Sequence, residues 1–193
     1  MNAERRFTSG LLFFFLFFFS TQLLAQSKKE IRKNHVKSQK VTTITVKDGK
    51  QSVVDDSFER YDEDANVVEE VSYDDAGQIK SRTLNSFDNS GSRTEQQVFG
   101  ADGKLKKRKT WKYNVNGDQT DESTFDGTGA LVEREIWTYT PEGDRNSEVV
   151  TDGKGKVTKK TILLYDKKGM RSSRKVYDAN GTLLFEKKYT YEY

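Results

Sequence analysis

The chain has 193 residues, of which 33% are hydrophobic and 33% are charged, and its formal net charge is +3. This balance of charge gives no reason to expect nucleic acid as a partner. With no cysteine and a single histidine, the sequence excludes disulfides, thiolate and multi-histidine metal sites and Cys-His pairs, so we expect no metal, no cofactor and no catalytic residue.

The N-terminus has the pattern of a secretory signal peptide. Arg5 and Arg6 precede an apolar run over residues 11–19, and a small residue, Ala25, follows shortly after it. We expect residues 1–25 to be cleaved off. An uncleaved anchor is the alternative, but the run is shorter than the roughly 20 apolar residues that span a bilayer. The cleaved chain is then no integral membrane protein, and we expect it to be secreted, periplasmic or on the cell surface of a bacterium.

Residues 26–40 form a basic segment with one acid, Glu30, and six lysines and arginines. We expect a flexible lead-in, and the alternative is an arm for an anionic surface such as lipopolysaccharide or an acidic glycan. His35 lies in this segment without a second histidine or cysteine to share a metal. We therefore expect an exposed side chain with no chemical role.

Residues 41–46 are β-branched throughout and end at Asp48-Gly49, which is a two-residue hairpin signal. Residues 51–61 are then the return strand, and an irregular turn follows at 62–66.

From there on a turn recurs, with an aspartate or asparagine three residues before a glycine in most copies. The glycines alternate at spacings of 14 and 12 residues, at positions 77, 91, 103, 117, 129, 143, 155, 169 and 181. Each spacing leaves a strand-length segment rich in threonine, valine and aromatic residues. We therefore predict an all-β fold over residues 41–193: an antiparallel meander of about ten strands, built from 26-residue tandem repeats, in a curved or coiled open sheet.

The longer segments share one pattern. Apolar or aromatic residues stand mostly two, eight and ten residues after the turn glycine, and a charged residue stands five after it. Residues at even distances from the turn glycine share one face of the strand, so the pattern predicts a buried apolar face and a solvent-exposed opposite face. The shorter segments, such as 118–124, are polar on both faces, and we expect them to be exposed.

Tyr165-Asp166-Lys167-Lys168-Gly169 and Tyr177-Asp178-Ala179-Asn180-Gly181, each followed by strand residues, resemble the YD repeat of RHS-type proteins. The similarity covers roughly residues 61–193, with Gly100, Asn114 and Thr140 at the aspartate position of other copies. The resemblance implies an exported, coiled β-sheet surface that binds or encloses something, with no catalytic residues in its repeats.

Two acidic features are candidates for chemistry. Glu133 and Glu135 share a strand face beside Trp137, as a glycosidase site would require; the alternative is a charge ladder against Lys107, Lys109 and Lys159. The acid-rich run over residues 55–75 offers oxygen ligands for calcium, but it lacks the EF-hand spacing, and solvated turns are the alternative.

Four aromatic residues could stack on sugar rings or contact a partner if the sheet leaves them uncovered: Trp111, Trp137, Tyr189 and Tyr191. Packing within the sheet is the alternative. We therefore expect a non-enzymatic exported module for adhesion, or for binding a carbohydrate or protein partner. The alternative is a structural protein of the envelope or of a surface assembly, and an enzyme is a third hypothesis.

Overall fold

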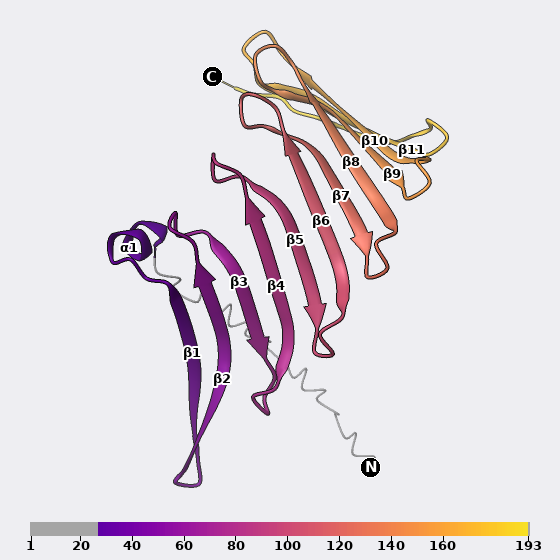
Figure 1. The fold of residues 1–193 in the computed structure, drawn as a ribbon. Helices are drawn as coiled ribbons and strands as arrows, with labels where there is room; N and C mark the ends of the chain where they lie inside the picture. The colour runs from indigo at the N-terminus through magenta and orange to yellow at the C-terminus, as the bar shows by residue number, and fades with distance from the viewer. Residues whose placement is uncertain (1–26, 193) are drawn as a thin grey trace, which may run out of the picture.

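The computed structural model describes residues 27–192, so the predicted signal peptide lies outside the described residues. One short helix is followed by one sheet of 12 strands, in which each strand pairs antiparallel with the next (Figure 1). The elements are α1 (Lys28–Lys33), β1 (Ser38–Lys47), β2 (Lys50–Tyr61), β3 (Val67–Tyr73), β4 (Ile79–Phe87), β5 (Arg93–Gly100), β6 (Leu105–Tyr113), β7 (Gln119–Asp126), β8 (Leu131–Tyr139), β9 (Arg145–Asp152), β10 (Val157–Tyr165), β11 (Arg171–Asp178) and β12 (Leu183–Lys188).

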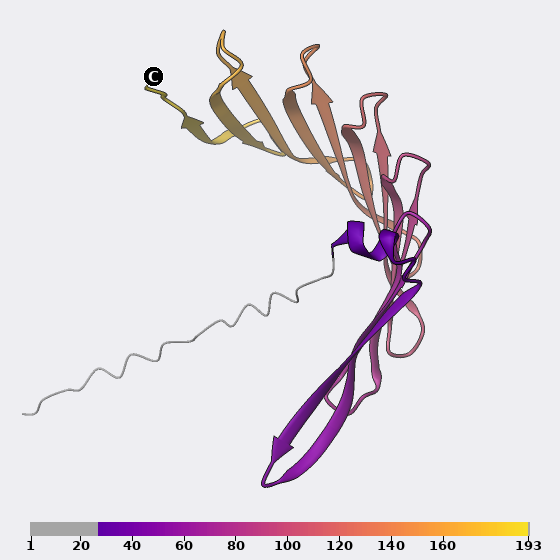
Figure 2. The same ribbon diagram turned by 90° about the vertical axis from the view of Figure 1, so that its left-hand side faces the viewer.

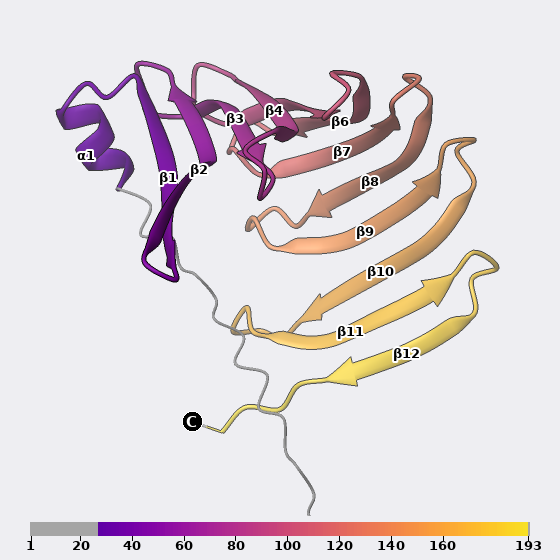
Figure 3. The ribbon, with the colours of Figure 1, turned by 90° about the horizontal axis from the view of Figure 1, so that it is seen from below.

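The sheet bends into an open arc (Figure 2), and β1 and β12 lie at its two ends without meeting (Figure 3). Within residues 27–192 each strand contacts only its neighbouring strands, and no second sheet packs on either face. The predicted all-β, curved, open antiparallel meander is therefore confirmed. The twelve strands exceed the expected number of about ten, and one strand that was not expected is β3, which lies within the acid-rich run.

The recurring turns explain the meander. At Asp74 the side chain accepts hydrogen bonds from the backbone N–H groups of Ala76 (3.0 Å) and Gln78 (2.9 Å). Gly77 closes the same turn with a φ of +73°, a conformation that a side chain would strain. The same aspartate contacts recur at Asp126 and four other turns: Asp88, Asp152, Asp166 and Asp178.

Helix α1 was not predicted and lies within the basic segment that we expected to be flexible. A capping box starts this helix: Ser27 and Glu30 each accept the other's backbone N–H with a side-chain oxygen. Ile31 is buried against Tyr61 and Ala65, at the end of β2. Six helical residues are too few to show a helical period in the sequence, so this contact and the cap determine the helix. No helix in the described part of the chain is long and apolar enough to cross a membrane.

Burial differs from the expected pattern in two ways. The apolar residues two positions after the turn glycine are half-buried or exposed, as at Ile79 and Leu183, because nothing covers the strand ends in a single-layer sheet. Conversely, the polar strand β7 is not exposed, since Asp121 and Ser123 are buried. The Asp121 carboxylate accepts hydrogen bonds from Arg134 Nε (2.8 Å) and from the Ser123 hydroxyl (3.0 Å), which offset the cost of burying it.

Candidate binding face

Cross-strand pairing places the aromatic and acidic residues of the central strands on one face. Trp111 in β6 is opposite Glu122 in β7, and Glu122 is opposite Glu135 in β8. In the next pair of strands, Trp137 is opposite Glu148 in β9. Residues directly opposite each other share a face, and so do alternate residues of one strand. These five side chains therefore occupy one surface, which we call the inner face.

The helix α1 lies on the concave side of the arc (Figure 2), and this identifies the inner face as the concave one. Ile31 of α1 lines a hollow together with Asn85 and Gln96. Asn85 is opposite Gln96, and Gln96 is opposite Lys109, which lies two residues before Trp111. The helix therefore covers one end of the inner face, and nothing in residues 27–192 covers its centre.

On β6 and β7 the inner face holds a complete set of polar contacts, which we call the Lys109 cluster: Lys109, Trp111 and Glu122. Glu122 accepts the Lys109 ammonium on one carboxylate oxygen and the Trp111 indole N–H on the other, the latter at 2.8 Å. Burial raises the pKa of Glu122, but the hydrogen bonds from Lys109 and Trp111 outweigh it and the pKa is lowered. Each charged or polar group of this cluster has its partner within the chain.

On β8 and β9 the equivalent residues stand 26 positions further along, and we call them the Glu135 cluster: Glu135, Trp137 and Glu148. Here the lysine is replaced by glutamate. Glu148 pairs instead with the ammonium of Lys159, at 2.7 Å. The Trp137 indole nitrogen is buried and has no hydrogen-bond partner in the described residues, and the same holds for the hydroxyl of Thr161, which is opposite Glu148.

Glu135 itself lies among like charges. Burial and the carboxylates of Glu148, Glu122 and Glu133 raise its pKa, against a smaller opposing effect of Lys159. No ion pair or hydrogen bond to Glu135 occurs within residues 27–192. The Glu135 cluster is therefore a half-buried acidic site without an intramolecular cation at its centre.

The four aromatic residues proposed as possible sugar or partner contacts do not lie together. Trp111 and Trp137 are on the inner face, two strands apart, but each is only 8% exposed. The guanidinium of Arg93 covers the Trp111 ring at 4.4 Å, and that of Arg145 covers the Trp137 ring at 5.8 Å. The two tryptophans are thus packed within the sheet and present no bare ring to a sugar.

Tyr189 and Tyr191 lie just beyond β12, far from the tryptophans, and both are half-buried. The Tyr191 hydroxyl donates to the carbonyl of Arg171 at 2.9 Å. The same bond, to a carbonyl 20 residues earlier in the chain, occurs at three other strand ends: Tyr113, Tyr139 and Tyr165. This tyrosine has a structural contact that recurs along the sheet.

Of the two acidic candidates, Glu133 and Glu135 do share the inner face beside Trp137. The expected charge ladder is present in another form, because Lys109 and Lys159 pair with glutamates of the short strands, Glu122 and Glu148. Sequence reasoning missed both of these glutamates. The signal that could have found them is their position opposite a tryptophan in each unit, 11 residues after it.

The acid-rich run is used for internal contacts. Asp62 accepts hydrogen bonds from both nitrogens of Asn66 at 2.8 Å, and Glu69 lies between Arg60 (2.9 Å) and Arg82 (2.7 Å). Within residues 27–192 no group of three or more histidine, cysteine, aspartate or glutamate side chains could hold a metal ion.

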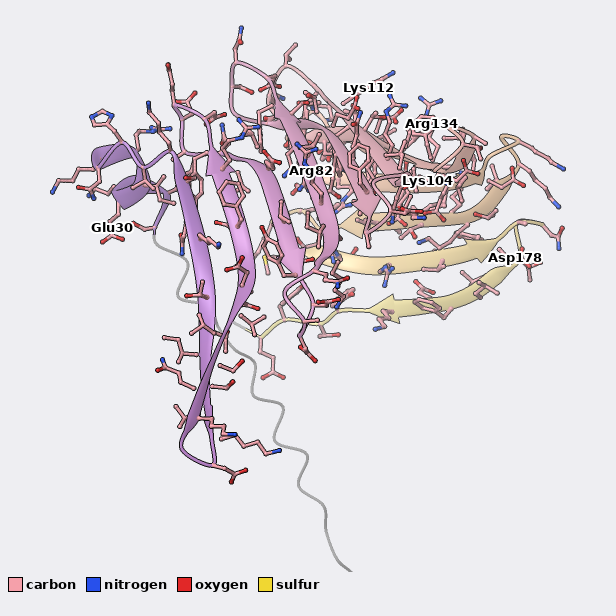
Figure 4. All side chains as sticks on the ribbon, turned by 60° about the horizontal axis from the view of Figure 1, so that its bottom comes forward. Glu30, Arg82, Lys104, Lys112, Arg134 and Asp178 are labelled. Atoms are coloured by element: carbon pink, nitrogen blue, oxygen red, sulfur yellow. The ribbon has the colours of Figure 1, made fainter. Side chains whose placement is uncertain are left out.

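The opposite, outer face carries the charged column that the sequence indicated. Lys112 and Arg134 extend from this side of the sheet in Figure 4. Its arginines make contacts within the sheet as well as with solvent, since Arg134 pairs with the buried Asp121 and Arg108 lies over the Phe125 ring at 4.6 Å. On β7 and β8 the charged residues Asp121 and Arg134 of the outer face are therefore paired with each other, whereas Glu135 of the inner face has no such partner in the described residues.

No protein-family model matches the chain, and neither does any curated protein. Solved structures match it at low identity. A porin-like protein from Bacteroides uniformis is 12% identical, with 76% of this chain and 75% of that chain covered and a TM-score of 0.45. The Tc holotoxin pore of Photorhabdus luminescens is 11% identical, with 80% and 10% covered and a TM-score of 0.49.

A protein of unknown function from Bacteroides fragilis is 14% identical, with 81% of this chain and 96% of that chain covered and a TM-score of 0.24. At these scores the similarities carry no argument about partners. The resemblance to RHS-type YD-repeat proteins stays a prediction from the sequence.

Proposed function

We propose that the chain is an exported, non-enzymatic β-repeat module that binds a protein or carbohydrate partner on its inner face, outside the bacterial cytoplasm. The observation that supports this is the contrast between the two faces. On the outer face Asp121 is fully paired, whereas on the inner face Glu135 and the Trp137 indole have no partner in the described residues. Buried polar groups are nearly always satisfied in proteins, so a partner that completes them gains binding energy.

The shape supports the same proposal. The inner face is concave and open at its centre, and a continuous backbone ladder fixes the register of its strands. A surface whose backbone is already ordered loses less conformational entropy when a partner binds than a segment that must fold on binding.

Two adjacent exposed residues of β8 provide the test. Glu133 projects from the inner face and Val132 from the outer face of the same strand. We expect the purified protein to bind members of a glycan array or a peptide array, Glu133→Arg to lose these partners, and Val132→Arg to retain them. The proposal fails if neither array gives binding, or if the two variants lose binding equally.

A second function is favoured by a different observation. The edge strand β12 exposes three large apolar residues, Leu183 (47%), Leu184 (60%) and Phe185 (42%), and its outer backbone edge is unpaired within the described sheet. Such an edge can pair with another chain, as a structural protein of a surface assembly would. Sedimentation velocity tests this: concentration-dependent association without ligand, abolished by Phe185→Lys, would favour assembly over ligand binding.

A further inference from the structure

The Lys109 and Glu135 clusters are built on the same backbone positions. Lys109 and Glu135 each stand six residues after a turn glycine, and each lies two residues before a tryptophan. In both clusters that tryptophan is opposite a glutamate of the next strand. The two sites therefore differ at their centre by one side chain, an ammonium in the first and a carboxylate in the second.

In the Lys109 cluster the ammonium has a defined effect. It holds Glu122 in the position from which the second carboxylate oxygen accepts the Trp111 N–H at 2.8 Å. Lysine carries three donors and no acceptor, so one ammonium can serve more than one carboxylate. The cluster thus shows how a lysine side chain is bound on this face.

In the Glu135 cluster two linked observations show that the arrangement of the Lys109 cluster is incomplete. The Trp137 indole N–H is unpartnered although Trp137 is only 8% exposed, and Glu148, the acceptor opposite it, pairs with Lys159 instead. Glu122 is also directly opposite Glu135, and two like charges in this position destabilise a sheet. An ammonium between these carboxylates would offset the repulsion and draw Glu148 towards Trp137, so that its second carboxylate oxygen accepts the indole N–H as Glu122 does from Trp111.

We propose that the Glu135 cluster binds a lysine side chain of a partner protein, whose ammonium takes the place that Lys109 holds in the neighbouring cluster. The inference rests on the proposed function and specifies its partner class. A lysine is favoured over an amino sugar because the carboxylates are half-buried. A four-carbon stem can reach them, whereas an amine attached directly to a sugar ring would bring ring hydroxyls along.

The chain offers a direct readout, because it has two tryptophans and one belongs to each cluster. In a ¹⁵N-labelled sample of the full chain, a five-residue glycine peptide with a central lysine should shift the Trp137 indole signal saturably and leave the Trp111 signal in place. A matched peptide with norleucine, which keeps the stem without the charge, should shift neither signal. Equal shifts with both peptides, or equal shifts of both indoles, would overturn the inference.

Substitution at the centre of the site gives the second arm. Glu135→Lys installs the residue of the neighbouring cluster, so we expect the Trp137 indole to adopt a Trp111-like shift without peptide, and peptide binding to be lost. Glu135→Gln, which changes shape least, should weaken peptide binding about tenfold. Unchanged peptide affinity in Glu135→Gln would overturn the inference even if Glu135→Lys failed to fold.

A third arm separates this inference from the proposed function. A glucosamine oligosaccharide that shifts the Trp137 indole where the lysine peptide does not would overturn the lysine assignment and leave the binding module standing. If Glu133→Arg loses array binding and the lysine peptide has no effect on the Trp137 indole, the lysine assignment is likewise overturned and the binding module stands. Absence of any array binding would remove the proposed function itself.

Discussion

The Lys109 and Glu135 clusters show how a difference at one position decides whether the polar groups of a repeated surface are paired within the chain. Both place a buried tryptophan opposite a glutamate, on neighbouring strand pairs of one face. With lysine at the centre the three side chains satisfy one another. With glutamate there, the indole N–H is unpartnered and the pKa of the central carboxyl is raised. The backbone is maintained in both, so the fold tolerates an incomplete site.

The largest effect should come from removing a tryptophan. We expect Trp111→Ala to cost about 3–5 kcal/mol of unfolding free energy, because a buried ring and its bond to Glu122 are both lost. Trp137→Ala should cost less, since its indole N–H makes no hydrogen bond. Thermal unfolding followed by circular dichroism measures both. Equal losses in the two variants would contradict the distinction between a complete and an incomplete cluster.

The next effect lies on the outer face and serves as the reference for a fully paired site. Arg134→Ala leaves the buried carboxylate of Asp121 without its guanidinium, at a cost of about 1–3 kcal/mol. The exposed outer-face residue Lys112 is the control, and Lys112→Ala should change the unfolding free energy by less than about 0.5 kcal/mol. Chemical denaturation would detect the difference, and similar values for the two variants would show that Asp121 is not held by Arg134.

Removing the central lysine should make the first cluster resemble the second. We expect Lys109→Gln to cost about 1 kcal/mol. The pKa of Glu122 is lowered in the folded protein, so its stabilising contribution is present above its ordinary value of 4.5 and is lost as the pH falls through the folded pKa. The variant should therefore lose stability at neutral pH and approach the parent in acid. A loss that is constant with pH would exclude this electrostatic origin.

The smallest effect is a gain. The folded state raises the pKa of Glu135 above its ordinary value of 4.5, so folding favours the protonated carboxyl over the carboxylate. As the pH rises through the folded pKa the carboxyl ionises, and at neutral pH the charged carboxylate lowers the free energy of unfolding. Glu135→Gln should thus stabilise the protein at pH 7 by about 0.2–1 kcal/mol. The gain should vanish below the ordinary value, and a gain that persists there would contradict the assigned cause.

Much of the fold could be predicted from the sequence because the turn carries its own chemistry. An aspartate that accepts two backbone N–H groups and a glycine with positive φ define where each strand ends, as at Asp74 and Gly77. The alternation of side chains then follows from the pleat. By contrast, α1 depends on the burial of Ile31 against residues 30 and 34 positions later, Tyr61 and Ala65, which no local pattern reveals.

The site could be predicted only in part, because cross-strand neighbours depend on register. In the sequence, Glu135 and Lys109 are equivalent positions of successive long strands and could be imagined as partners. The intervening strand β7 places Glu122 between them, and Glu122 forms the ion pair with Lys109. Bulges near the strand ends, such as the one between Lys112 and Tyr113, shift this register by a residue.

The tyrosines at the strand ends have a consequence for how the sheet is formed and lost. Each hydroxyl, as at Tyr113 and Tyr165, is bonded to a carbonyl 20 residues earlier, in the strand made just before its own. All strand pairing is likewise with immediate neighbours in the chain. A chain that emerges N-terminus first can therefore complete each pair of strands before the next strand emerges. Under tension applied to its ends, the same array would come apart strand by strand, without a single all-or-none rupture.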